Sequence, residues 1–95
     1  MGAPRLVLFT TKTDPMSRER LGGFLGDGHL VDLQSAHVAM HGHPSPYLRD
    51  RTAFAFGREP ALATVVDVLA WVDSQRPPGV MVPERNANVL APLSP

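Results

Sequence analysis

The sequence predicts a small α+β domain. We expect a mostly antiparallel sheet, made of an N-terminal strand, a central hairpin and a short C-terminal strand, with two helices packed on one face. Three features indicate this: a strand-like run near the start, a glycine-rich stretch with a turn signal, and one long segment with apolar residues at helical spacing. A chain of 95 residues has room for one domain only.

The first expected element is a strand over Arg5–Thr11 (RLVLFTT), because leucine, valine, phenylalanine and threonine fit a pleated, half-buried surface. The polar stretch Lys12–Arg18 (KTDPMSR) has a central proline and predicts a loop.

The stretch Glu19–Leu33 (ERLGGFLGDGHLVDL) predicts a β-hairpin. Asp27 and Gly28 suit a two-residue type I′ turn, whose central positions both need a positive φ. That turn would set Leu25 opposite Leu30. Both faces of the hairpin then carry apolar side chains, so we expect the chain's own helices to cover one face and something else to cover the other.

Two short helical segments are expected next. Ser35–Met40 fits one or two helical turns before a break that contains glycine and proline. Ser45 and Pro46 predict the start of a second helix, over Tyr47–Phe56, because serine can accept a free backbone N–H and proline loses no bond at the first helical position. Gly57 is the expected end of that helix.

The clearest predicted helix is Ala61–Gln75 (ALATVVDVLAWVDSQ), with Pro60 as its first helical residue. Its apolar stripe is predicted to pack on the sheet and consists of Leu62, Val65, Val66, Leu69 and Val72.

Residues 1–79 are therefore predicted to form the core of the domain. Five of the ten prolines fall between Pro77 and Pro95, and two short apolar pieces lie among them, Val80–Val82 and Val89–Leu90, which could each add an edge strand. We interpret 80–95 as a C-terminal strand and a proline-rich lead-out toward another domain.

Composition excludes several classes of protein. Nine basic and nine acidic residues give zero net charge without a basic stripe, which argues against nucleic-acid binding. There is no cysteine for disulfides and no apolar run of about 20 residues for a membrane span, and the stretch MGAPRLVLFTTK lacks the long apolar region and small-residue cleavage site expected of a signal peptide. We expect a cytoplasmic globular domain with neither nucleic-acid nor membrane partners.

The glycines do not form a phosphate-binding loop. No lysine and hydroxyl of the type GK[ST] follow them, and Gly23, Gly26 and Gly28 have the reverse of the dinucleotide spacing, with a strand after them. A structural hairpin is the better interpretation.

His37 and His41 lie four residues apart, with His43 close behind, so HVAMH has the outer spacing of a zinc-protease motif. Val38 stands where that motif has its glutamate base, so hydrolytic zinc chemistry is not expected. We interpret these three as surface histidines, an interpretation that sub-micromolar zinc binding, lost in His37→Ala, would overturn.

Other candidate groups are scattered. No two of the nine carboxylates are neighbours, although Glu19 and Asp32 bracket the hairpin and could pair with Arg18 or Arg20, or cap a helix. Trp71 is interpreted as a core or domain-interface aromatic residue, and the other aromatic residues considered are interpreted in the same way: Tyr47, Phe54 and Phe56. We predict no catalytic, cofactor-binding or metal-ligating residue, and no cofactor, in this chain.

The order of these pieces resembles the N-terminal domain of fumarylacetoacetate hydrolase (FAH) family enzymes. In that family a segment of the type lG.l.gd.vvdL..A precedes helices, and a segment of the type lLAPlp.P leads into the catalytic domain. The positions that resemble them are Leu21-Gly22, Leu25-Gly26-Asp27, Leu30–Leu33, Ala36 and Leu90–Leu93. The resemblance covers about Arg5 to Pro95, and its motifs are structural.

The resemblance implies an accessory role. FAH-family enzymes are typically homodimers that use a divalent metal, usually magnesium, to hydrolyse, decarboxylate or isomerise β-diketo or 2-oxo acids, often in the breakdown of aromatic compounds. Their metal ligands and catalytic His–Glu pair belong to the catalytic domain, so no such residue carries over to this chain. We therefore expect a domain that is non-catalytic by itself and whose partner is an FAH-type catalytic domain, in cis or in trans. The alternative is a free-standing protein-binding or assembly module with the same small fold.

Overall fold

The computed structural model describes residues 4–93 and has the predicted α+β architecture. Five strands and three α-helices are formed by these residues, together with one 3₁₀ turn. In chain order they are β1 (Leu6–Thr11), β2 (Arg20–Phe24), β3 (His29–Asp32), α1 (Leu33–His41), α2 (Arg51–Phe56), α3 (Arg58–Gln75), β4 (Met81–Pro83), η1 (Glu84–Asn86) and β5 (Ala87–Pro92).

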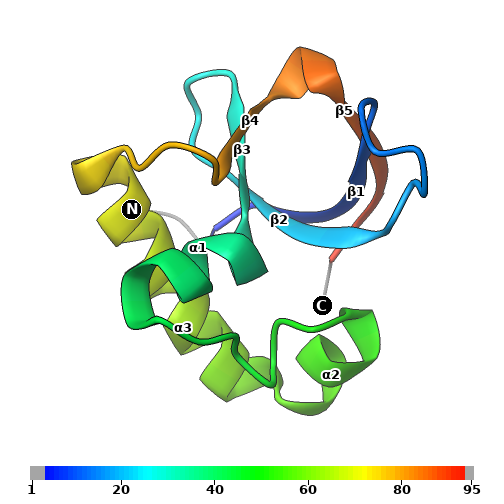
Figure 1. The fold of residues 1–95 in the computed structure, drawn as a ribbon. Helices are drawn as coiled ribbons and strands as arrows, with labels where there is room; N and C mark the ends of the chain where they lie inside the picture. The colour runs from blue at the N-terminus through cyan, green and yellow to red at the C-terminus, as the bar shows by residue number, and fades with distance from the viewer. Residues whose placement is uncertain (1–3, 94–95) are drawn as a thin grey trace.

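The five strands make one sheet in the order β4-β3-β2-β1-β5, with every neighbouring pair antiparallel. The sheet is curled into a ring, and η1 joins its two edge strands at the top of the ring (Figure 1). Two backbone hydrogen bonds hold this junction: Glu84 N–H to the Gly28 carbonyl (2.9 Å) and Lys12 N–H to the Asn86 carbonyl (2.8 Å).

The central hairpin is present, but its predicted register and turn are wrong by one residue. Phe24 lies opposite Leu30, and the strands are joined by the four residues 25–28 instead of a two-residue turn at Asp27 and Gly28. The positive φ angles fall at Gly26 (86°) and Gly28 (87°), while Asp27 lies between them and accepts the His29 N–H. A longer loop with glycine at its two left-handed positions replaces the predicted turn.

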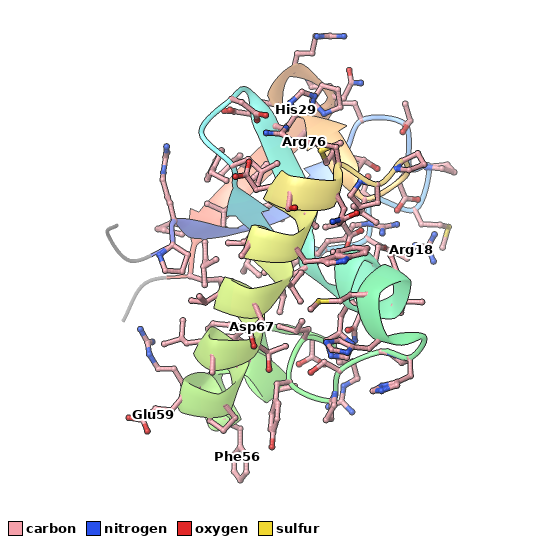
Figure 2. The ribbon with its side chains drawn as sticks, turned by 90° about the vertical axis from the view of Figure 1, so that its left-hand side faces the viewer. Arg18, His29, Phe56, Glu59, Asp67 and Arg76 are labelled. Carbon is pink, nitrogen blue, oxygen red and sulfur yellow. The ribbon has the colours of Figure 1, made fainter. Side chains whose placement is uncertain are left out.

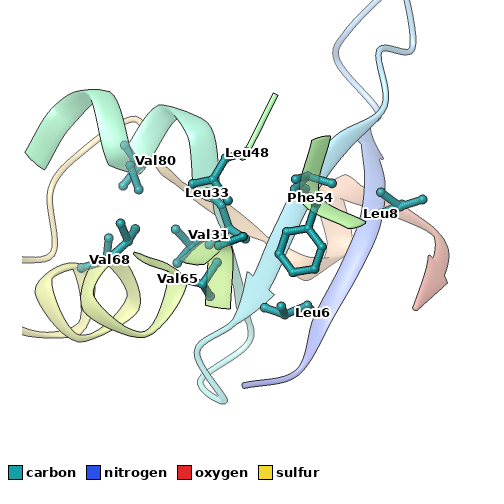
Figure 3. Packing of buried hydrophobic residues seen from close by; sticks show 13 residues of the cluster. Leu6, Leu8, Val31, Leu33, Leu48, Phe54, Val65, Val68 and Val80 are labelled. Carbon is teal, nitrogen blue, oxygen red and sulfur yellow. The ribbon is translucent and has the colours of Figure 1, made fainter. Parts of the chain in front are cut away.

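The sheet has a hydrophobic cluster on each face, because apolar side chains alternate between the two sides of its strands. The helices cover one face, where Leu6, Leu8, Leu21 and Val31 join residues of α1, α2 and α3 (Figure 3). The other face carries Val7, Phe9 and Leu30, with Phe24, Val82 and Ala87 packed against them.

The second cluster corrects the expectation that something other than the domain covers the second face of the hairpin. Val82 of β4 and Ala87 of β5 come from opposite edges of the sheet, yet both pack against the same cluster. The curl of the sheet therefore brings its own edges over its inner face.

Helix α1 is longer than predicted and begins after Asp32, whose side chain accepts the Ser35 N–H as N-cap. The predicted helix over Tyr47–Phe56 is wrong in its start. Helix α2 begins only at Arg51 with Asp50 as N-cap, and it ends as predicted at Gly57. The Ser45 hydroxyl does accept a backbone N–H, from Tyr47, but no helix starts there, and the Ser45 backbone forms two hydrogen bonds with the Gln34 side chain that fix the loop to α1.

Helix α3 begins at Arg58, two residues before the predicted first helical residue Pro60. Pro60 is tolerated there because amides of the first helical turn have no intrahelical acceptor. The predicted stripe is partly wrong: Val66 is exposed, Leu62 and Leu69 lie at the border of the core, and the fully buried residues are Ala61, Val65, Val68 and Val72.

The two apolar pieces predicted near the C-terminus form both edge strands, β4 and β5. Pro83 and Pro92 lie in these edge strands, where proline costs no interior ladder bond. Residues 81–83 and 87–92 are thus part of the sheet, with η1 between them. Residues 94–95 of the predicted lead-out lie outside the described residues.

Candidate functional site: an apolar groove between α2 and β5

Helix α2 carries two phenylalanines, Phe54 and Phe56, which have the same interpretation from the sequence but opposite exposure in the structure. Phe54 is 3% exposed and packs toward β1, near Leu6 and Leu8 (Figure 3), whereas Phe56 is 96% exposed. Residues two apart on a helix point to opposite sides, since each residue turns the helix by about 100°. Figure 2 shows Phe56 projecting from the lower end of the molecule.

Phe56 stands at an open groove of about 690 Å³. One wall comes from α2 and the other from the end of β5, with Leu8 of β1 also contributing. The lining consists of Leu8, Arg51, Thr52, Ala55, Phe56, Ala91, Pro92 and Leu93. Arg51 is the one charged residue in this lining, and its Nε lies 4.0 Å from a Glu19 carboxylate oxygen. The groove is therefore an apolar surface with one cation at its margin.

The same strand exposes further apolar side chains beside a bulge. Leu8 pairs with Ala91 and Phe9 with Val89, so Leu90 is an extra residue on β5 without a partner on β1. Val89 and Leu90 are both more than half exposed. Such exposure of large apolar groups on an edge strand is typical of interaction surfaces.

A second, smaller hollow of about 220 Å³ lies between β2 and the start of α1, and ion pairs fill its rim. Arg20 donates to Asp32 (Nη1–Oδ2 2.6 Å) and lies 3.7 Å from Asp14, while Arg18 pairs with Asp14 at 3.3 Å. The predicted pairing of Asp32 with Arg20 is confirmed, and Asp32 is also a helix cap. Because its arginines already have carboxylate partners, this hollow offers no free cation for an anionic ligand.

The carboxylates with perturbed pKa values belong to turns and helix ends. Backbone N–H donation from Met16, with help from Arg18, holds the pKa of Asp14 below its ordinary value. Donation from the Arg76 guanidinium lowers the pKa of Asp27 and raises that of Arg76. Backbone donation from Ala53 lowers the pKa of Asp50. Each shift follows from a structural ion pair or cap, and none of these carboxylates lines the apolar groove.

Among the candidate residues of the sequence, the histidines are the ones whose interpretation changes. His37 is buried (7% exposed), so describing all three as surface histidines is wrong for His37, while His41 and His43 are exposed. Trp71 packs partly buried against the main cluster, in agreement with a core role. Tyr47 packs its ring against the Gly57 backbone.

Phe56 is the residue of the groove that the sequence analysis missed, since it received the same interpretation as Phe54. The signal was present: on a helix that buries Phe54, a residue two positions later must face away from the core.

Comparisons with known proteins give no match: neither a protein-family model nor a curated protein nor a solved structure matches the chain. The resemblance to the FAH family therefore rests on the sequence motifs alone. Within residues 4–93, no helix combines the length and apolar character that crossing a membrane requires.

Proposed function

We propose that this chain is a non-catalytic accessory domain of an FAH-family enzyme and that its α2–β5 groove docks the catalytic domain, in cis or in trans. The reaction of such an enzyme is hydrolysis, decarboxylation or isomerisation of β-diketo or 2-oxo acids, with a divalent metal held by the catalytic domain. A cytoplasmic location, expected from the sequence, is part of this proposal.

The observation that carries the proposal is the exposure of Phe56 beside the end of β5. A phenylalanine that is 96% exposed next to an apolar groove contributes nothing to the stability of the domain itself. Aromatic anchors on apolar patches are a common basis of protein interfaces. Leu93, the last described residue, lines the same groove, so a polypeptide continuing from it would start at this surface.

The decisive test begins with the gene: DNA beyond the codon for Pro95, or a neighbouring gene, should encode an FAH-type catalytic domain. This chain should be inactive on acylpyruvates with magnesium, and addition of that catalytic domain should produce a complex measurable by calorimetry. Phe56→Ser should weaken the complex at least tenfold. Met16→Ser, which removes another highly exposed apolar side chain (74%) away from the groove, is the matched control and should not.

Both variants should keep the thermal unfolding midpoint of the original chain, since neither side chain is buried. Turnover of acylpyruvates by this chain alone would refute a non-catalytic role. Equal binding by the Phe56→Ser variant and the original chain would refute docking through the groove.

A free-standing assembly module is the second candidate, and one observation favours it. Both faces of the sheet are filled from within the chain, so the domain has the core it needs to fold alone. In that case the groove would join two copies of the chain. Light scattering would then give a dimer that Phe56→Ser converts to a monomer, and no catalytic domain would be required.

A further inference from the structure

Three of the four histidines gather at the C-terminal end of α1. The ring centroids of His37 and His41 are 4.5 Å apart, those of His37 and His43 are 5.3 Å apart, and those of His41 and His43 are 6.1 Å apart. The backbone explains this grouping. His37 and His41 lie one helical turn apart on the same face of α1, and Gly42 then ends the helix with φ 83° and turns the chain so that His43 returns toward His37.

A hydrogen bond determines which nitrogen of His37 carries the proton. Its Nδ1 lies 2.6 Å from the backbone carbonyl oxygen of His43. A carbonyl oxygen can only accept, so Nδ1 is the donor, and the neutral ring keeps its lone pair on Nε2. The Nδ1 of His43 lies 3.2 Å from the Pro44 carbonyl and follows the same reasoning.

This arrangement is the one that metal-binding histidines use. A ligating imidazole almost always donates its other N–H to a carbonyl or carboxylate, which fixes both the tautomer and the orientation of the ring. The His37 ring therefore already has this outer hydrogen bond, which is partly buried, whereas the bond of the His43 ring is longer and exposed.

The ring separations also fit one shared ion. With Zn–N distances of about 2.0–2.1 Å and tetrahedral angles, the centroids of two imidazoles on one zinc lie roughly 5 Å apart. The observed separations fall on both sides of this value. In the side-chain positions of the structure, no three such groups among residues 4–93 already converge as a metal site. The movement required is a rotation of the exposed His41 and His43 side chains, and for His43 this rotation gives up the exposed 3.2 Å bond to the Pro44 carbonyl.

We propose that His37, His41 and His43 bind a divalent transition metal of the zinc type through their ring nitrogens, with water in the fourth position. Three neutral imidazoles without a carboxylate favour zinc, copper or nickel over magnesium or calcium, which prefer oxygen ligands. Val38 occupies the place of a general base, so the site would bind a metal without hydrolytic chemistry. The inference is independent of the proposed accessory role, because no histidine lines the α2–β5 groove.

The test is calorimetric titration of the intact chain with zinc chloride alone, alongside single histidine variants. We expect one zinc per chain with a dissociation constant in the micromolar range or below. His41→Ala and His43→Ala remove exposed side chains, so both variants should fold. Each should lose more than the roughly 10–100-fold in affinity that loss of an outer hydrogen-bond partner costs a zinc site.

His29→Ala is the matched control, because His29 is the remaining histidine and begins β3, where it bonds Asp27. It should bind zinc as tightly as the original chain. His37→Asn addresses the buried member: the asparagine amide can still donate to the His43 carbonyl, but it lacks the Nε2 ligand, so the fold should survive while zinc binding is lost.

Cobalt(II) gives a second readout, since a tetrahedral site with nitrogen ligands absorbs visible light far more strongly than the octahedral aqueous ion does. Failure of zinc to bind the original chain at micromolar concentration would overturn the proposal. So would binding that survives in His41→Ala and His43→Ala, or that is lost equally in His29→Ala.

Discussion

Gly22 and Gly23 are adjacent in β2, but we predict that replacing them with alanine has different effects. They face opposite sides of the sheet. A Cβ on Gly22 would lie 2.7 Å from Cδ1 and Cε1 of Phe9, a residue with no exposed surface. A Cβ on Gly23 would meet Leu69 at 3.0 and 3.2 Å, at the far end of a partly buried side chain that can move.

Two opposing contributions determine how much Gly22→Ala changes the free energy of unfolding. Overpacking of a rigid core costs about 1–3 kcal/mol, whereas alanine recovers about 0.5–1 kcal/mol relative to glycine inside a strand. The net loss should be about 1–2 kcal/mol, which lowers the unfolding midpoint of a domain this size by roughly 4–16 °C. Gly23→Ala should change the free energy of unfolding by no more than about 1 kcal/mol, because the end of the Leu69 side chain can move away from the added methyl group.

The assay is urea unfolding of both alanine variants, of Phe9→Leu and of the Gly22→Ala, Phe9→Leu double variant. Leucine is smaller than phenylalanine, so the double variant should be more stable than the sum of the two single losses predicts, with a coupling of about 1 kcal/mol. Equal stability of the two alanine variants, or additive losses in the cycle, would refute the reasoning from the Phe9 contact.

Three further predictions concern the capping, charge and packing described above. Asp32→Ala should lose at least the roughly 0.5–2 kcal/mol of a helix N-cap, while Asp32→Asn should lose less because asparagine still caps; urea unfolding compares them. Since Arg76 lowers the pKa of Asp27, their stabilising contribution is present above the ordinary carboxyl value near 3.8 and is lost as pH falls through the lowered folded pKa. Arg76→Gln should therefore lower the urea midpoint at neutral pH and not at a pH well below 3.8, and an equal loss at both would contradict it. Phe54→Ala should lower the free energy of unfolding by about 3–5 kcal/mol because Phe54 is buried, whereas Phe56→Ala should leave the thermal unfolding midpoint unchanged because Phe56 is exposed.

Much of the fold could be predicted because its signals are local. The strand at β1, the long helix α3 and the two edge strands follow from runs of apolar residues whose spacing identifies the element. The hairpin could be predicted as well, but its register could not. The choice between a two-residue and a four-residue connection depends on which face of β2 packs on Phe9, and that contact comes from a separate strand.

The candidate groove could not be predicted from the sequence, because it too depends on contacts between distant segments. Its walls, α2 and the end of β5, are about 35 residues apart in the chain, and no periodic pattern connects them. The start of α2 differs from the prediction for the same kind of reason: the Ser45 hydroxyl accepts the Tyr47 N–H, but the Gln34 side chain holds the Ser45 backbone, and the helix starts only at Arg51. Here a tertiary contact, that of Gln34 with Ser45, overrides the local helix propensity.

The η1 junction has a consequence for synthesis of the chain. Phe9 of β1 pairs with Val89 of β5, 80 positions later, so β1 receives its second neighbour only after those intervening residues have been made. At about 5–20 residues per second, the ribosome needs roughly 4–16 s to cover that interval. During this time one edge of β1 and the inner face with Phe9 lack their contacts with β5, and uncovered strand edges and apolar surface of this kind favour aggregation before folding is complete.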